Sequence, residues 1–256
     1  MSEFEREVVG RLDRAASDDA LQNSAATFMR TSIPTKYSYN YYWLGRPIIQ
    51  YPQDMVAMQE LIWKVRPDLI VETGIAHGGS LILSASMLAL LDLSDAALAG
   101  EVYDPKMPRR RVVGIDIDIR PHNREAIEAH PLASRIDLIQ GSSVADEIVT
   151  EIRGRAEGAG RVMVCLDSNH THEHVLAELQ AYAPLTSVGS YCVVFDTIVE
   201  DLPADMSSDR PWAPGDNPKT AVWEYLKSHP EFEIDKSLDA KLQISVAPDG
   251  YLKRVR

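Results

Sequence analysis

Apolar residues in this chain form short continuous runs that alternate with segments of helical periodicity. A run of four to seven apolar residues bounded by turn residues is typical of a buried strand, whereas apolar positions three or four apart predict a helix. Segments of this kind, some of them interrupted or ended by a polar residue, fall at residues 69–72, 112–118, 136–140, 162–166 and 191–195. Because strands alternate with helices, the pattern predicts an α/β fold with a doubly wound, mostly parallel sheet of the Rossmann-like kind.

Helices are expected around these strands, at residues 52–65, 81–91, 123–130, 144–155, 171–182 and 217–226. Residues 1–36 have apolar residues at helical spacing, which predicts one or two amphipathic helices as an N-terminal extension. Such an extension could be a lid, an oligomer contact or a loosely packed tail. Residues 92–110 and 199–218 are expected to be irregular loops.

The C-terminal part has a different pattern. Apolar runs at residues 232–234, 242–246 and 251–255 predict edge strands in a hairpin, with a turn at residues 248–250. Strands of this kind would add an antiparallel piece to the parallel core, so the sheet is expected to be mixed.

A glycine-rich segment follows the first predicted strand. Gly74, Gly78 and Gly79 can take positive φ and let a ligand lie against the backbone, and Ser80 is placed to cap the next helix. The glycine spacing differs from the dinucleotide pattern G-x-G-x-x-G, and Glu72 would repel a pyrophosphate. The segment therefore favours a cationic, adenosine-containing ligand such as S-adenosylmethionine. The alternative is a tight strand-to-helix turn without a ligand.

Polar residues follow the second and third strands. In doubly wound folds the acid at the end of the second strand accepts hydrogen bonds from ribose hydroxyls, which favours Asp116, with Asp118 as the second candidate. Ser142 is expected near the adenine edge, and Ser143 is placed to cap the next helix. A solvated aspartate at a strand end is the alternative interpretation of Asp116.

Aspartates end the fourth and fifth strands, at Asp167 and Asp196. The carboxyl ends of parallel strands share one edge, so both are expected beside the turn at Gly74. Paired carboxylates can hold Mg²⁺ and leave positions open for substrate oxygens. His170 is a candidate general base for a hydroxyl proton. The alternative is that both aspartates cap helices and that His170 is a surface residue.

Composition narrows the class of partner. The 256 residues carry a formal net charge of −12, which disfavours a nucleic acid or an anionic membrane. The one basic run, residues 109–111, is expected in a solvated loop. Cys165 and Cys192 lie in apolar runs, as expected of buried residues in a reducing compartment. No signal peptide and no apolar stretch long enough to span a bilayer were recognised, so we expect a cytoplasmic protein.

These motifs resemble the cephalosporin hydroxylase family, which also contains rhamnosyl O-methyltransferases of antibiotic biosynthesis. The residues that carry the resemblance are Tyr39-Asn40, Trp43-Leu44-Gly45, Pro52, Glu72-Thr73-Gly74, Gly78-Gly79-Ser80, Gly114-Ile115-Asp116, Leu166-Asp167-Ser168-Asn169-His170, Asp196 and Pro248-Asp249-Gly250-Tyr251-Leu252. The resemblance implies a class I S-adenosylmethionine-dependent methyltransferase with Mg²⁺ dependence. With the N-terminal extension included, we expect a helical and aromatic lid segment at residues 1–50 and an S-adenosylmethionine-binding methyltransferase domain at residues 51–256.

The resemblance also implies roles for individual residues. The expected cofactor contacts are Glu72, Gly74, His77, Gly79, Ser80, Asp116, Ser142 and Asp167. The expected metal ligands are Asp167, Asp196 and Thr197, and the catalytic residues are His170 as base and Asp167. The acceptor is expected to lie against Tyr39, Tyr42, Trp43 and Trp212, although the aromatic residues at 37–47 could instead form a core plug.

One position departs from the pattern. Related metal-dependent methyltransferases often have Glu-Asp at the end of the fifth strand, and Phe195 precedes Asp196 here, so Thr197, Glu200 or Asp201 would have to supply a further ligand. The leading hypothesis is a homo-oligomeric O-methyltransferase acting on a rhamnosyl-type sugar of a glycosylated small molecule. The alternatives are a methyltransferase component of cephalosporin-type methoxylation and a partner subunit that binds the cofactor without catalysis.

Overall fold

The predicted alternation of strands and helices is present in the computed structural model, which describes residues 2–256. The central sheet has the order β5-β4-β3-β6-β7-β9-β8. Its strands are β3 (Leu69–Thr73), β4 (Arg111–Asp116), β5 (Ile136–Gln140), β6 (Val162–Leu166), β7 (Tyr191–Val194), β8 (Phe232–Ile234) and β9 (Tyr251–Arg254). Strands β3 to β7 are parallel, and β9 pairs antiparallel with both β7 and β8. The doubly wound, mixed sheet is therefore confirmed.

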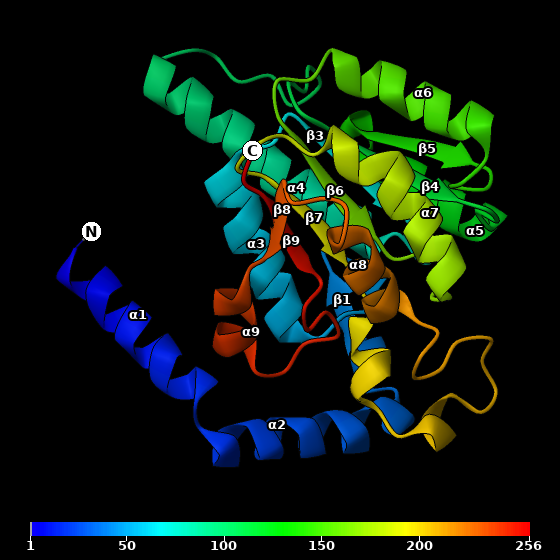
Figure 1. The fold of residues 1–256 in the computed structure, drawn as a ribbon. Coiled ribbons are helices and arrows are strands. Elements are labelled where there is room, and N and C mark those ends of the chain that lie inside the picture. The colour runs from blue at the N-terminus through cyan, green and yellow to red at the C-terminus, as the bar shows by residue number, and fades with distance from the viewer. Residues whose placement is uncertain (1) are drawn as a thin grey trace.

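Helices cover both faces of this sheet (Figure 1). One face packs against α3 (Pro52–Val65), α4 (Gly79–Ala99), α5 (Pro121–Glu128) and α9 (Lys236–Leu242). The other packs against α6 (Asp146–Glu157), α7 (His172–Tyr182) and α8 (Pro218–Leu226). Ile70 faces the first layer, while Leu69 and Val71 face the second. This alternation along a strand is why a continuous apolar run indicates a strand covered on both sides.

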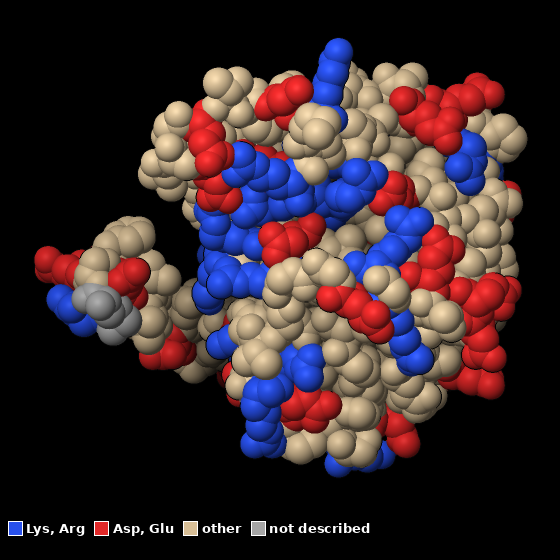
Figure 2. Space-filling view, turned by 90° about the horizontal axis from the view of Figure 1, so that it is seen from above, with Lys and Arg blue, Asp and Glu red and all other residues tan. Residues whose placement is uncertain are grey.

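The N-terminal extension consists of α1 (Glu3–Ala16) and α2 (Asp19–Ser32), as the periodicity predicts. Helix α1 lies at the outer edge of the protein (Figures 1 and 2), contacts α9 and has no buried residue. After two short 3-10 turns, at Ile33–Thr35 and Tyr37–Asn40, the chain forms a small antiparallel sheet. Its strands, β1 (Tyr41–Trp43) and β2 (Arg46–Ile48), pack against α4 beside the central sheet.

The loop prediction for residues 92–110 is wrong in its first part, because α4 continues to Ala99. The charged residue that suggested an end to the helix, Asp92, is fully buried and accepts hydrogen bonds from Arg110 at 2.6 Å and Arg135 at 2.8 Å. Arg110 is therefore 9% exposed, not part of a solvated loop. Figure 2 shows this mixture more broadly, since basic side chains gather in a band bordered by acidic ones.

Helix α4 also corrects the expectation about apolar stretches. Among residues 2–256 it is the one helix long and apolar enough to cross a membrane by length and composition, and its most apolar window has a mean hydropathy of 1.7. That window is 56% buried inside the protein, and α4 packs against α3 and β4. Its apolar character is that of a helix enclosed by a protein core.

The strand prediction for residues 242–246 is wrong. Helix α9 ends at Leu242, and the following segment is held by a buried acid of α3. Asp54 accepts hydrogen bonds from the Ser245 hydroxyl at 2.6 Å and the Val246 amide at 3.0 Å. These contacts satisfy polar groups that a strand ladder would otherwise pair, and the two flanking strands, β8 and β9, pair with each other instead.

Candidate active site

The carboxyl ends of β3, β4, β6 and β7 open into one cavity of about 520 Å³, where the strand order reverses. Ligands of doubly wound sheets bind at this position. The predicted site residues that line the cavity are Tyr39, Gly74, His77, Gly79, Ser80, Asp116, Asp167, His170, Asp196 and Trp212. Glu72 is 3% exposed and faces a smaller inner cavity, which Ser80 and Asp167 also line.

The glycine-rich turn brings the ends of β3 and β6 into contact. Gly74 has a φ of +80°, and a Cβ added there would lie 2.0 Å from the carbonyl oxygen of Asp167. Gly78, not Ser80, is the N-cap of α4, so the predicted cap is wrong. The Ser80 hydroxyl instead donates to the Glu72 carboxylate. This bond satisfies a buried carboxylate, which would be costly to leave without a donor.

Asp116 braces the same turn. One of its carboxylate oxygens accepts hydrogen bonds from the amides of Ile75 at 3.0 Å and Ala76 at 3.4 Å. The other accepts from the amide of Asp118, whose own side chain is exposed. A carboxylate has about four lone pairs, so Asp116 retains acceptor capacity toward the cavity that it lines.

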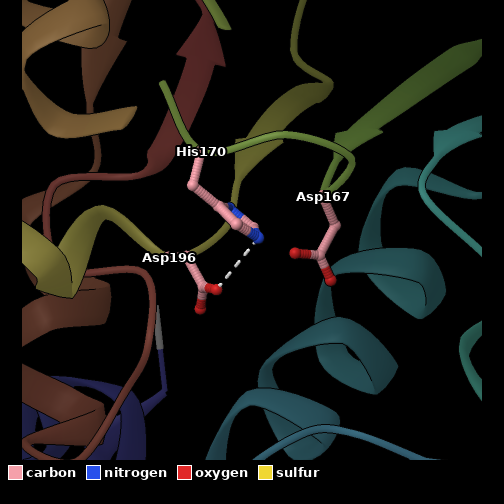
Figure 3. A group of neighbouring side chains, drawn as sticks. All are labelled: Asp167, His170 and Asp196. Carbon is pink, nitrogen blue, oxygen red and sulfur yellow. Dashed lines mark ion pairs between the residues drawn. The ribbon is translucent and has the colours of Figure 1, made fainter. Parts of the chain in front are cut away.

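Asp167, His170 and Asp196 meet at the edge of the cavity (Figure 3). One ligand atom from each lies within 4.8 Å of the others, and His170 Nε2 is 3.3 Å from Asp196 Oδ2. His170 lies in the loop before α7 and packs its ring edge-on against Trp212, with 4.7 Å between ring centroids. The three side chains predicted to act together are therefore neighbours.

Thr197 and Phe195 flank Asp196 but point elsewhere. The Thr197 hydroxyl donates to the carbonyl oxygen of Pro248 at 2.6 Å, and Phe195 is 6% exposed in the apolar core. Thr197 as a metal ligand thus stays a prediction without a contact that supports it.

The carboxyl groups of the site favour the binding of a positively charged ligand. Asp167 reaches the cavity but is otherwise surrounded by protein, and this burial, followed by the charges of Asp196 and Glu72, raises the pKa of its carboxyl well above the usual range. Burial also raises the pKa of Glu72 to about 7, although the hydrogen bond from Ser80 opposes the shift. A cation beside these carboxyls would stabilise their charged forms.

Sequence analysis missed a polar network under the cavity. The Ser168 hydroxyl donates to Glu178 Oε1 at 2.6 Å, and His174 Nε2 lies 3.1 Å from the Ser143 hydroxyl and 3.2 Å from that of Ser168. The network joins the segments after β5 and β6. Ser143 therefore does not cap α6, whose N-cap is Ala145. No local pattern signals these contacts, because the two serines follow different strands and are 25 positions apart in the sequence.

The structure separates the four aromatic residues assigned to the acceptor. Tyr39 and Trp212 line the cavity, whereas Tyr42 is 68% exposed and lies outside its lining. Trp43 packs against the core, and its Nε1 donates to the Ser86 hydroxyl at 3.0 Å. The core-plug interpretation thus holds for Trp43. Ser142 also lies outside the cavity lining, and its contact with adenine stays a prediction.

The strand order, with β9 antiparallel between β7 and β8, and the cavity at the glycine turn define the class I methyltransferase fold. The sequence model of the Rhamnosyl O-methyltransferase/CmcI family matches residues 35–255. The chain belongs to this family, and the predicted resemblance is confirmed. Membership makes it an enzyme of the O-methyltransferase class.

Individual relatives are similar over most of their length. The Rhamnosyl O-methyltransferase of Mycobacterium leprae (strain TN) is 26% identical over 216 residues, which are 83% of this chain and 82% of the relative. That of Mycobacterium tuberculosis (strain ATCC 25618 / H37Rv) is 28% identical over 206 residues, 78% and 73% of the two chains. A solved structure of CmcI with Mg and SAM has a TM-score of 0.54 at 21% identity and covers 85% of this chain and 78% of its own. The structural likeness supports the fold.

Proposed function

We propose that this protein transfers a methyl group from S-adenosylmethionine to a hydroxyl of a rhamnosyl-type sugar on a glycosylated small molecule, with the help of Mg²⁺. The observation that carries the proposal is the meeting of Asp167, His170 and Asp196 beside the Gly74 turn in one cavity. Membership of a family described by rhamnosyl O-methyltransferases, and curated relatives of that name, support the sugar acceptor.

The residues present fit both bound groups. Asp167 and Asp196 offer the carboxylate oxygens that Mg²⁺ prefers. The ion, when bound, polarises an oxygen as a Lewis acid and lowers the cost of forming an alkoxide. The turn from Gly74 to Gly79 offers a close backbone surface for the cofactor, and Asp116 offers an acceptor for its ribose hydroxyls.

In the proposed reaction, His170 takes the proton of the acceptor hydroxyl. The hydroxyl oxygen forms a bond to the methyl carbon while the bond from that carbon to sulfur breaks, which leaves a neutral thioether. Asp196 lies beside His170 Nε2 and stabilises the imidazolium that forms. Tyr39 and Trp212 line the opening and would exclude water and position the sugar.

A rival proposal is a subunit that binds the cofactor without catalysis, and Phe195 favours it, because its buried ring cannot replace a carboxylate ligand. Calorimetry that detects cofactor binding, with no product from any hydroxylated acceptor in Mg²⁺, would support this rival. A cytoplasmic location and assembly into a homo-oligomer belong to the leading proposal. The exposed Phe4 and Val9 of α1 are consistent with a contact between subunits.

The test is methyl transfer from labelled S-adenosylmethionine to a panel of rhamnosides, with a hydroxylated cephem as the second acceptor class. Label in a rhamnoside, lost on chelation of Mg²⁺, is expected. Label in the cephem alone would favour the methoxylation alternative.

Within the same assay, His170→Ala and Asp167→Ala are expected to lower turnover by roughly 10²-fold or more, because each removes a group that acts on the reacting oxygen. In His170→Ala, binding of S-adenosylhomocysteine, measured by calorimetry, should stay within about threefold of wild type, since its turn and ribose contacts remain. Wild-type turnover in either variant would refute its assigned role.

A further inference from the structure

Gln50 lies between the two cavities and was not assigned a role by the sequence. It lines the large cavity together with Asp167, and it also lines the small inner cavity with Asp54 and Glu72. Its position follows β2 and comes just before α3, so a strand end and a helix start fix its backbone. The side chain is 7% exposed and cannot be regarded as a solvated surface amide.

The carboxamide of Gln50 is half satisfied. Its Nε2 donates to Asp167 Oδ2 at 3.3 Å, which fixes the orientation of the amide because a carboxylate oxygen can only accept. Its Oε1 is buried and has no hydrogen-bond partner among residues 2–256. Burying a polar atom without a partner costs free energy. In a binding cavity, such an acceptor indicates a donor or a cation that arrives with the ligand.

The acidic residues around Gln50 favour a positively charged partner for its Oε1. Three carboxyl groups, those of Asp54, Glu72 and Asp167, line the inner cavity. Asp54 receives its hydrogen bonds from Ser245, Val246 and Tyr251, and Glu72 receives one from Ser80, so the bonds that reach these two acids come from neutral donors. A low-dielectric cavity lined with acids concentrates negative potential and attracts a cation.

We propose that Gln50 is a binding residue of the methyl-transfer site. Its Oε1 binds the cationic group that lies beside Asp167, by coordination or by accepting a hydrogen bond, while its Nε2 donates a hydrogen bond to the Asp167 carboxylate. Two sources supply such a group under the proposed function, on which this inference rests. They are the divalent metal ion and the ammonium group of the cofactor's methionine portion. Both need an oxygen acceptor next to a carboxylate.

Binding measurements on the full chain test the proposal and separate the two sources. Mn²⁺ binding is measured by electron paramagnetic resonance without cofactor, and S-adenosylhomocysteine binding is measured by calorimetry in the presence of a chelator. Gln50→Leu keeps the size of the side chain and removes both polar atoms. It should weaken one of the two affinities roughly 10-fold or more, because a hydrogen bond to a charged group is lost. Loss of Mn²⁺ affinity identifies the metal, and loss in the chelated sample identifies the ammonium.

Two further variants keep the test decisive. Gln50→Glu retains an oxygen at this position and adds a charge, while it loses the Nε2 donor to Asp167. Because the added charge acts directly on the bound cation, the variant should tighten binding of the same cation, even if Gln50→Leu fails to fold. Gln53→Leu is the matched control, since Gln53 Oε1 is also buried without a partner but Gln53 lines neither cavity. It should change neither affinity. Wild-type affinities for both ligands in Gln50→Leu, or an unchanged affinity in Gln50→Glu, would overturn the proposal.

The outcome is independent of the acceptor. A wild-type protein that binds both ligands but methylates no rhamnoside would refute the proposed sugar substrate and leave the role of Gln50 intact. Methyl transfer to a rhamnoside together with unaltered binding in Gln50→Leu would do the reverse.

Discussion

The acidic side chains enclosed near α4 and those at the cavity differ in their hydrogen-bond partners. In α4, Asp92 is fully buried and pairs with Arg110 and Arg135, so its charge is balanced within the chain. At the cavity, the hydrogen bond to Glu72 comes from a serine and the one to Asp167 from an amide. A buried acid that forms ion pairs with arginine therefore stabilises the fold. A buried acid with only neutral hydrogen-bond donors stays available to a cationic ligand.

The largest expected effect on stability is at the balanced acid. Asp92→Asn removes the counter-charge of the buried Arg135 and leaves Arg110 with Asp95 as its remaining close partner, so it should lower the free energy of unfolding by about 3–5 kcal/mol. Urea unfolding followed by circular dichroism measures it. Asp95→Asn is the control, because Asp95 also pairs with Arg110 but its side chain is 33% exposed, and the loss there should be at most about 1 kcal/mol. Equal losses in the two variants would break the comparison.

The opposite sign is expected at Glu72. Its pKa rises from the ordinary 4.5 to about 7, so the folded state holds a proton that the unfolded state releases, and the free energy of unfolding falls as the pH rises through this interval. Glu72→Gln should therefore stabilise the ligand-free protein by up to about 3 kcal/mol at pH 8. At pH 4 the gain should vanish. Urea unfolding at the two pH values measures this effect. If Glu72→Gln is less stable than the wild type at pH 8, Glu72 is not a buried carboxylate that lacks a positive partner.

Addition of Mg²⁺ should stabilise the protein through the acids of the cavity and not through the acids that pair with arginine. A cation that binds only the folded protein stabilises it by about 2.7 kcal/mol at one hundred times its Kd. Thermal unfolding with and without Mg²⁺ should show this gain in the wild type and in Asp95→Asn. Asp167→Asn should lose it. If Asp167→Asn gains as much as the wild type, the ion binds elsewhere.

The smallest effect is expected in the network under the cavity. Glu178→Gln weakens the hydrogen bond from Ser168, next to Asp167, and should weaken S-adenosylhomocysteine binding by roughly two- to tenfold. His172→Ala is the matched control, since His172 begins the same helix but contacts Thr220 at 2.8 Å. Calorimetry on both variants decides the matter. An equal change in both variants would assign the effect to α7 as a whole.

Local patterns were sufficient for much of the fold. The bounds of α3, β5 and β6 agree with the predicted ranges, because each of these mainly apolar segments is followed by a charged residue or a glycine. Errors arose where a distant partner decides the structure. Asp92 stays within a helix because arginines from other elements neutralise it, and residues 245 and 246 avoid a strand because Asp54 binds them.

The candidate site shows the same division. Asp167, Asp196 and Gly74 could be predicted to converge, since parallel strands share one functional edge. Gln50 could not, because it lies outside the central sheet and reaches Asp167 across 117 positions of sequence. Trp43 was assigned to the acceptor although it packs in the core, since sequence alone does not show which side of a short strand faces a cavity.

The most direct test of the account is a crystal structure with S-adenosylhomocysteine and Mn²⁺, read by anomalous scattering. We expect one manganese between the carboxylate oxygens of Asp167 and Asp196, and the cofactor sulfur over the Gly74 turn on the side that faces His170. Manganese bound away from these two aspartates, or a sulfur placed where His170 cannot reach an acceptor hydroxyl beside it, would contradict it.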